Sequence, residues 1–331
     1  MVPQLDAVCE RRRRLLIAAT GLWAVQPSLF AQSAVYPVRP IQFLVAAPPG
    51  GPSDGFARMF ADEMRQLLGQ PMIIDNRAGA GGAIAAQAVA RAAGDGYTLM
   101  LSWIGNATNQ TLVPKQGFDI NRDFVHITEL LAGFNVLVAR TGLGVRDLKD
   151  LLSKARAKPG SLSIASAGNG SSGHLALELL RQRAGISVLH VPYRGGSPAL
   201  NDLLAGQVDA MFINQDAAIP YARTGHLIPL AITSAARIPA FPDLPTVAES
   251  GFPGFEATAW AGLSAPRGTP DVVVMRLYDA AMKALRGPLR AKQEALGAQV
   301  VGSTPAQYTT FVRSETEKWA KVIQTAGIHI D

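Results

Sequence analysis

The segment Ser161–Leu180 reads SLSIASAGNGSSGHLALELL and decides the fold class. An apolar run, LSIAS, precedes Gly168, Gly170 and Gly173 at GxGxxG spacing, and a helical pattern follows. This order of strand, glycine-rich turn and helix is typical of βαβ units. The unpaired N–H groups at the start of such a helix attract anions, as does its dipole. The segment therefore predicts an α/β fold and a turn that binds a negatively charged group.

The same alternation of short apolar runs and helical patterns continues along the chain from Ile41. It predicts largely parallel sheets flanked by helices. Asp54 is expected to cap the first helix, Gly69 to end it, and Thr304 with Gln307 to form a capping box. Strands are expected over 41–47, 72–75, 97–102, 162–166, 188–193, 208–214 and 227–234. Helices are expected over 56–69, 84–93, 173–183, 197–206, 217–225, 272–285 and 306–327.

Two extended, nearly uncharged stretches, 127–140 and 255–266, join these blocks of βα units. Two crossings of this kind predict two lobes, with a ligand in the cleft between them. We expect one lobe over 34–137 plus 256–331 and the other over 138–255.

The N-terminus resembles a secretory signal peptide. Arg11 to Arg14 precede an apolar run over 15–25, and LFAQSA supplies small residues for cleavage after Ala31 or Ser33. We expect residues 1–33 to be removed on export to the periplasm, by the general or the twin-arginine route. Cys9, the single cysteine, would leave with them, so the mature chain offers no disulfide and no thiolate.

The remaining composition excludes several function classes. The net charge is +6 for the whole chain and +4 without residues 1–33, and the basic residues are scattered, which argues against nucleic-acid binding. After the signal there is no apolar stretch of about 20 residues, the length that a membrane span needs. The five histidines show no metal-ligand spacing, and no GxSxG motif accompanies them. We therefore expect no metal site, and these motifs give no support for catalysis.

Two glycine-rich turns are candidates for anion binding. Gly50 and Gly51 precede one helix, and Gly168, Gly170 and Gly173 precede another. One turn in each lobe could hold a small anion from both sides. Two alternatives stay open at this point: the glycines could serve only tight turns, or Arg194 could bind the extra phosphate of NADP in an oxidoreductase. Ser171 and Ser172 are expected to cap backbone N–H groups.

Several motifs occur together in an order and spacing that resemble a known family. They are YPVRPIQFLVAAPPGGPSDGFAR, DNRAGAGG, DGYTLM, ASAGNGSSGHLALELL, HVPYRGGSPALNDLLAGQVDAMF, PDLPTVAES and WAGLSAPRGTP, spread over about residues 36–331. Together they resemble the Bug or TctC-like solute receptors of tripartite tricarboxylate transporters.

The resemblance implies a two-lobed periplasmic binding protein of the type II-like class, monomeric and not an enzyme. Such a receptor closes on a small carboxylate and delivers it to a membrane permease of one large and one small subunit. A receptor that reports to a signalling partner is the alternative within this class. The carboxylate would be held by the turn of Pro49, Gly50, Gly51, Pro52, Ser53 and Asp54, and by Gly168, Asn169, Gly170, Ser171, Ser172 and His174. Further contacts are expected from Ser102, Trp103, Asn106, Ser166, Tyr193, Arg194, Asn214 and Asp216.

The chain departs from the family pattern at two places. Ala46 and Ala47 stand where VPF is usual, and Ile213 stands where the family commonly has an aspartate. These departures predict a roomier, less polar pocket and disfavour an amino acid. We expect a mono- or dicarboxylate with an apolar or aromatic body, stacked on Trp103.

Overall fold

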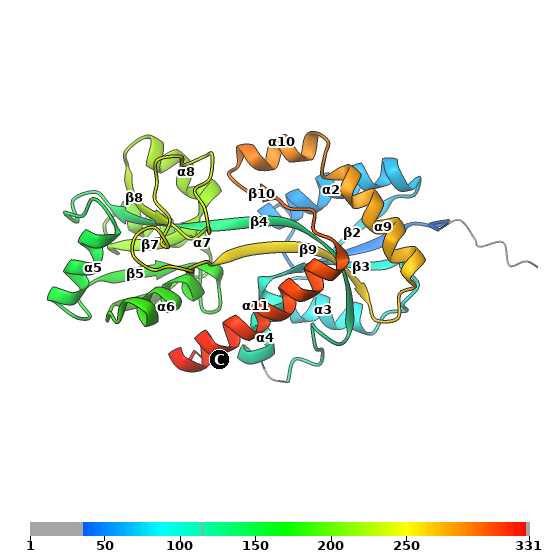
Figure 1. Cartoon of the computed structure of the whole chain (residues 1–331), viewed down its shortest axis with the longest axis horizontal. Coiled ribbons are helices and arrows are strands. Elements are labelled where there is room, and N and C mark those ends of the chain that lie inside the picture. Colours follow the sequence, from blue (N-terminus) through cyan, green and yellow to red (C-terminus); the bar gives the residue numbers. More distant parts are fainter. Residues whose placement is uncertain (1–35, 114, 329–331) are drawn as a thin grey trace, which may run out of the picture. The chain divides into compact units, whose positions relative to one another are not determined.

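Two long strands, β4 (Phe124–Arg140) and β9 (Thr258–Pro266), organise the computed structural model, which describes residues 36–113 and 115–328. The two strands pair antiparallel, and their last pair is Phe134 with Thr258. In Figure 1, β4 is green and β9 is yellow. At the next residue β4 passes into a second sheet, where Asn135 pairs with Asn214. The stretch 127–140, expected to be extended, is thus one strand shared by two sheets. The predicted signal peptide lies outside the described residues.

The first sheet has the order β2 (Met72–Asn76), β1 (Ile41–Val45), β3 (Thr98–Trp103), β9 and β4, and the short β10 (Gln299–Val300) also pairs with β4. Strands β1, β2 and β3 are parallel, as the βα pattern predicts. Strand β9 adds antiparallel pairs with β3 and β4, because it runs back along the sheet from the crossing whereas β4 runs toward it. The sheet is therefore mixed.

Alternate residues of β1 enter two different cores. Ile41, Phe43 and Val45 pack with residues of α2 (Pro52–Leu68) and α9 (Asp271–Ala284), whereas Leu44 packs with residues of α3 (Ala83–Ala90). This alternation is the period of two that a strand imposes on its side chains. Helices on both faces explain why the strand reads as a continuous apolar run in the sequence.

The second sheet has the order β8 (Leu227–Ile232), β4, β7 (Ala210–Asn214), β5 (Ser163–Ser166) and β6 (Leu189–Pro192). Strands β5, β6 and β7 are parallel to one another, β4 runs antiparallel to β7, and β8 pairs antiparallel with β4. Four helices belong to this half: α5 (Leu148–Ala157), α6 (Ser172–Ala184), α7 (Gly196–Leu204) and α8 (Gln215–Arg223). The α/β class is confirmed for both halves.

Two of the helix ends predicted from the sequence are confirmed, and one prediction is wrong. Gly69 follows α2 with a left-handed φ of 72°, and Thr304 with Gln307 forms the expected capping box of α11 (Pro305–Ala326). The expectation that Asp54 caps α2 is wrong, because the helix begins at Pro52 and Gly51 precedes it. The carboxylate of Asp54 is thereby free to serve the loop before the helix.

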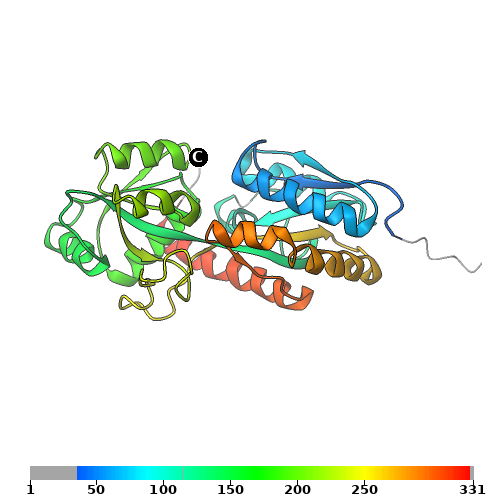
Figure 2. The ribbon, with the colours of Figure 1, turned by 90° about the horizontal axis from the view of Figure 1, so that it is seen from above.

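Helix α11, red in Figures 1 and 2, packs against both halves. It contacts α4 (Ile104–Leu112) beside the first sheet and α6 beside the second, and Gln182 Nε2 donates to Val322 O at 3.0 Å. The indoles of Trp260 and Trp319 both donate to Glu315 on this helix. The C-terminal helix, which the sequence assigned to the first lobe, therefore also supports the second.

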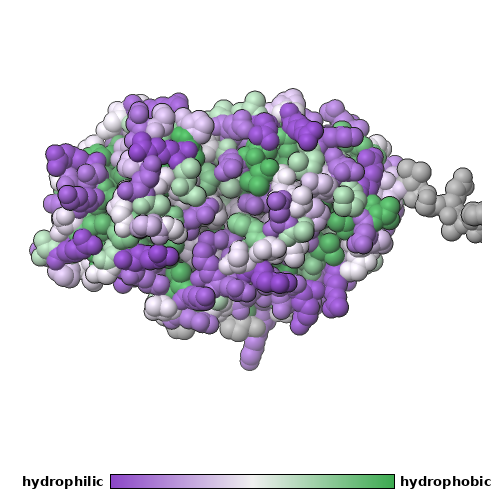
Figure 3. All heavy atoms as spheres, in the orientation of Figure 1, coloured by the Kyte–Doolittle hydropathy of each residue, from purple (hydrophilic) through white to green (hydrophobic). Residues whose placement is uncertain are grey.

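Three helices were not expected from the sequence: α4, α5 and α10 (Pro288–Ala295). The SWIGNATN stretch, expected as a loop, enters α4 at Ile104. Hydrophilic side chains cover most of the face shown in Figure 3, with hydrophobic ones scattered among them. Within the described residues, no helix is long and apolar enough to cross a bilayer.

Candidate functional site

The carboxyl ends of the parallel strands in both sheets point to the crossing at Phe134 and Asn135. In the first sheet, β9 starts there with Thr258, and β3 runs antiparallel to β9, so β1, β2 and β3 all end on that side. In the second sheet, Asn214 ends β7 opposite Asn135, and β5 and β6 run parallel to β7. Loops at the carboxyl ends of strands hold the ligands of open α/β sheets. Both predicted glycine turns lie at such ends.

The turn before α2 is organised by the buried carboxylate of Asp54. It accepts hydrogen bonds from Gly50 N at 2.9 Å, Arg58 Nε at 2.8 Å and Asn76 Nδ2 at 2.9 Å. Asn76 Nδ2 also donates to Ala47 O at 3.0 Å. These bonds, that of Arg58 above all, lower the pKa of Asp54 to about 2.

This arrangement corrects two expectations for the first turn. Asp54 is only 2% exposed and its oxygens are occupied by the protein, so its role is to hold the loop and not to contact a ligand. The N–H of Gly50, expected to be free, is satisfied by Asp54. Pro52 has no N–H, so Gly51, Ser53 and Asp54 carry the backbone donors for which no partner exists in the described part of the chain.

The loop after β3 supplies buried donors of its own. Trp103 N donates to Asn106 Oδ1 at 2.9 Å, which fixes the start of α4. Trp103 Nε1 and Asn106 Nδ2 are buried and have no acceptor among the described residues. Buried N–H groups without a partner are rare in folded proteins, and a bound ligand or water would satisfy them.

Ser102 is a correction to the predicted site. Its side chain is fully buried, and its hydroxyl bonds Gly262 O, Ser264 Oγ and Tyr308 Oη, each at 2.9 Å. A hydroxyl with three internal partners stabilises the junction of β3, β9 and α11 and has no capacity left for a ligand.

The second turn, between β5 and α6, is also held by its own side chains. Ser171 Oγ donates to Gly168 O at 2.7 Å and accepts from His174 N at 3.3 Å, so the expected capping role is confirmed. Ser166, fully buried, accepts from Gly168 N through Oγ at 3.2 Å. Gly170 N donates to His174 Nδ1 at 3.1 Å. The expectation that Gly170 N–H and His174 meet the ligand is therefore replaced by a bond between them.

The capping expected of Ser172 is not found, because its hydroxyl donates to Asn135 Oδ1. Two backbone donors remain at the start of α6. The N–H groups of Ser172 and Gly173 have no partner in the described residues, as is usual for the first turn of a helix. The helix approaches β7 so closely that a Cβ on Gly173 would lie 2.5 Å from Phe212 O, which only glycine avoids. The N-terminus of α6 is thereby pressed against the end of the second sheet, next to the crossing.

Asn135 lies beside this helix start and was missed in the sequence. It is 1% exposed, its Oδ1 accepts from Ser172 Oγ at 3.4 Å, and its Nδ2 is buried with no partner among the described residues. The only indication in the sequence is a polar residue inside the apolar run AGFNVLVA. Since that run was expected only to link the lobes, Asn135 was not considered as a ligand donor.

Most of the remaining predicted residues follow strands of the second sheet, and Pro49 and Ser53 follow β1 of the first. Tyr193 Oη donates to Asp202 Oδ2 at 2.7 Å, and burial together with this carboxylate raises the pKa of Tyr193 to about 12. Arg194 and Asn214 are exposed, and Asp216 is half-buried in the first turn of α8. Pro49, Ser53 and Asn169 are exposed on the two turns. A ligand role for these residues stays a prediction.

Ile213 does not enlarge the pocket as the sequence suggested. Its side chain is buried in the core between the second sheet and helices α7 and α8. It points away from the site, since successive residues of a strand face opposite sides and Asn214 is the exposed one. The prediction of a less polar pocket therefore rests on Ala46 and Ala47 alone.

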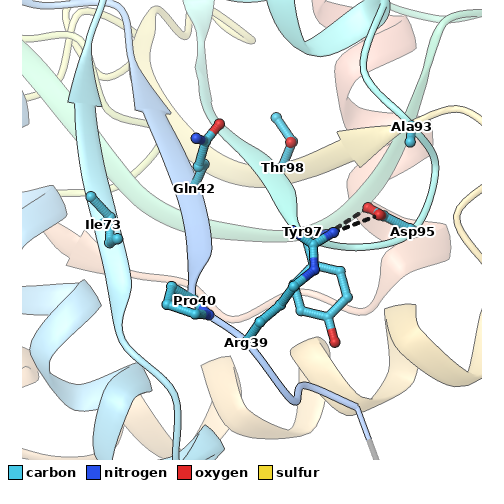
Figure 4. A pocket seen from close by; sticks show the side chains of 8 residues that line it. All are labelled: Arg39, Pro40, Gln42, Ile73, Ala93, Asp95, Tyr97 and Thr98. Carbon is cyan, nitrogen blue, oxygen red and sulfur yellow. Dashed lines mark hydrogen bonds and ion pairs between the residues drawn. The ribbon is translucent and has the colours of Figure 1, made fainter. Parts of the chain in front are cut away.

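A separate hollow of about 400 Å³ lies at the amino ends of β1 and β3, the end opposite the site (Figure 4). Its charged groups are already matched: Arg39 pairs with Asp95 at 3.0 Å and lies 3.9 Å from the ring centre of Tyr97. The charged residues that line it therefore leave no net charge to attract an anion. Within the described residues, no three His, Cys, Asp or Glu side chains gather as metal ligands.

Comparison with known proteins identifies the family. Residues 56–328 match the family model described as the tripartite tricarboxylate transporter family receptor. The chain belongs to this receptor family. The likeness to Bug and TctC-like receptors predicted from the ordered motifs is thereby confirmed.

Individual members of the receptor family are similar over almost the whole chain. Protein BugT of Bordetella pertussis is 37% identical over 319 residues, which are 94% of this chain and 97% of BugT. The structure of R. palustris Rpa4515 with adipate is 36% identical with a TM-score of 0.78, covering 89% of this chain and all of that one. MatC (Rpa3494) from Rhodopseudomonas palustris with bound malate is 36% identical with a TM-score of 0.74, covering 87% of this chain and all of that one.

Proposed function

We propose that this receptor captures a small organic carboxylate where the two sheets meet and delivers it to the membrane subunits of a tripartite tricarboxylate transporter. One observation carries the proposal: Asn135 Nδ2, which is buried, lies beside the N–H groups of Ser172 and Gly173, and none of the three has a partner in the part of the chain that the structure describes. Three N–H donors gathered at one helix start form a site for a carboxylate group.

The charges around this site favour an anion without an amino group. The carboxylate of Asp54, which could bind an ammonium, is already shared by Gly50, Arg58 and Asn76. Neutral N–H donors bind a carboxylate through charge-assisted hydrogen bonds and offer nothing to a cation. Amino acids are therefore disfavoured, in agreement with the interpretation of the sequence.

The first sheet supports a ligand with acceptors at both ends. Trp103 Nε1 and Asn106 Nδ2 are buried donors on that side, as Asn135 Nδ2 is on the other. A dicarboxylate would satisfy both sets, and a ligand reaching both sheets stabilises a closed arrangement by its contacts with the second one. Related receptors have been observed with adipate and malate, both dicarboxylates.

The remaining features follow from the receptor family and from the sequence. Export by a signal peptide over residues 1–33 would place the mature chain in the periplasm as a monomer. It would serve one large and one small membrane subunit, without a cofactor and without catalysis. The lobes would be 34–137 with 256–331, and 138–255. Family membership favours this function over an NADP-linked oxidoreductase, the alternative based on the GxGxxG spacing and Arg194.

Native mass spectrometry of protein purified without added ligand tests the proposal, followed by calorimetric titration. The titration panel would contain succinate, malate, adipate, benzoate, glutamate and aspartate. We expect retention or binding of a dicarboxylate with one site per chain. Binding only of amino acids, or of none of these acids, would overturn the assignment.

A further inference from the structure

Two histidines from different elements stack beneath the glycine turn of the second sheet. The rings of His174 on α6 and His190 on β6 are 4.0 Å apart between centres and 5° from parallel. His174 is 4% exposed and His190 is half-buried. Each ring also bonds one side of the turn, so the pair joins the turn to the sheet below it.

The hydrogen bonds determine which nitrogen of each ring carries the proton. Gly170 N donates to His174 Nδ1 at 3.1 Å, so Nδ1 accepts and the proton is on Nε2, which lies 3.8 Å from Glu178 Oε1. His190 Nε2 lies 2.7 Å from Ser166 Oγ. That hydroxyl donates to Gly168 O and accepts from Gly168 N, so the bond is completed when His190 Nε2 is the donor.

The two histidines stay neutral because burial and the nearby Arg181 lower the pKa of both rings. Burial is the main cause that lowers the pKa of His174 to about 3, followed by His190 and Arg181. Burial and Arg181 lower the pKa of His190 to about 4. Glu178, the carboxylate nearest to His174, is paired with Arg181 at 2.6 Å and is therefore neutralised. Two stacked rings at this distance could not both be charged without strong repulsion.

We propose that His174 and His190 are positioning residues: as a neutral stacked pair they hold the turn over residues 168–171, and thereby aim the donors of Ser172 and Gly173 at the carboxylate. This inference rests on the proposed function for its ligand. The rings themselves do not contact the ligand. His190 acts through Ser166 on one side of the turn and through the His174 ring on the other.

The variants separate the hydrogen bond from the bulk of the ring. His174→Leu fills the space but removes the acceptor for Gly170 N–H, whereas His174→Asn places an amide oxygen near the position of Nδ1. His190→Phe keeps a stacked ring and loses the bond to Ser166. His226→Leu is the matched control, because His226 is exposed and its ring bonds only Thr224 within the described residues.

The first readout needs no ligand. Long-range proton–nitrogen correlation NMR of the ligand-free wild-type protein should show His174 unprotonated at Nδ1 at pH 7. Hydrogen exchange at the Gly170 amide should accelerate at least about tenfold in His174→Leu and return to within about threefold of wild type in His174→Asn. A protonated Nδ1, or equal Gly170 exchange in wild type and His174→Leu, would overturn the inference.

The second readout is calorimetric affinity for adipate and malate between pH 7 and pH 4. For whichever of the two binds, His174→Leu and His190→Phe should weaken binding at least about tenfold, while His174→Asn and His226→Leu stay within about threefold. Wild-type affinity, corrected for the protonation of the acid's own carboxyl groups, should hold to about pH 5 and fall toward pH 4 as the rings begin to protonate. Equal affinity of all variants would contradict positioning. If neither acid binds wild type, the proposed function fails, and the NMR result still decides the role of the histidines.

Discussion

Thr233 is bonded to Asn135 in both directions at the point where the two sheets meet. Thr233 N donates to Asn135 O and Asn135 N donates to Thr233 Oγ1, each at 2.9 Å. The same hydroxyl donates to Ala257 O at 2.7 Å, on the segment that leads into β9. One buried threonine therefore joins both crossing strands and fixes the residue whose amide we assign to the ligand.

Replacing this hydroxyl should weaken the crossing. Thr233→Val keeps the side-chain shape but leaves Asn135 N–H and Ala257 O without a partner, at a cost of about 1–3 kcal/mol for each buried group. Urea unfolding would measure the loss. Thr233→Ser retains the hydroxyl and should lose clearly less stability; equal losses in the two variants would show that the hydroxyl bonds are unimportant.

The carboxylate of Asp54 should stabilise the first turn in a pH-dependent way. Its pKa is lowered from 3.8 to about 2, so the stabilisation is complete above about pH 4 and is lost as the pH falls toward 2. Asp54→Asn should lower the melting temperature at pH 7, and the difference from wild type should shrink between pH 4 and pH 2.5. Asp62→Asn, on the exposed side of α2, is the control and should have little effect at either pH. A constant difference across this range would contradict the assignment.

Backbone conformation should matter more than the Ser172 hydroxyl in the second turn. Gly170 has φ of 76°, where a Cβ costs about 1–2 kcal/mol. Gly170→Ala should therefore reduce dicarboxylate affinity more than Ser172→Ala, which removes only a 3.4 Å bond to Asn135. Gly185→Ala introduces the same strain at the far end of α6 and should lower stability without changing affinity. The opposite ranking of Gly170→Ala and Ser172→Ala would make the hydroxyl the main donor.

Glu129 should make the protein less stable as the pH rises. Burial, with Glu315 and Glu256 nearby, raises the pKa of Glu129 from 4.5 to about 8. Because the folded state prefers the protonated carboxyl, stability is greatest below about pH 4.5 and declines as the pH rises through 8. Glu129→Gln should thus raise the melting temperature relative to wild type at pH 8.5 more than at pH 5. Glu317 is exposed, so Glu317→Gln should show no such trend. A similar trend in that variant would contradict the assignment of the effect to the buried carboxyl of Glu129.

Much of the fold could be predicted from the sequence because its strands and most helices carry strong apolar periodicity. Helix α4 could not, since the buried polar residues Asn106, Thr108 and Asn109 interrupt its apolar pattern. The order and spacing of the motifs in the sequence were sufficient to predict the receptor family.

The location of the site could be predicted, but its chemistry only in part. Glycine spacing predicted both helix starts, yet it does not reveal which side chains fold back onto them, as Asp54 does at Gly50 and His174 at Gly170. Ser102 was misplaced because a strand buried on both faces gives no sign of which way a residue points. Asn135 was missed because its importance arises from the meeting of two sheets.

The most direct test of the carboxylate site is calorimetric titration of wild type and Asn135→Asp with the dicarboxylate that binds best among succinate, malate and adipate. The substitution preserves shape, removes the Nδ2 donor and places a negative charge against the ligand. We predict at least about a hundredfold loss of affinity, about 2.7 kcal/mol, with Asn201→Asp on the exposed side of α7 unchanged. Undiminished binding by Asn135→Asp would contradict the account.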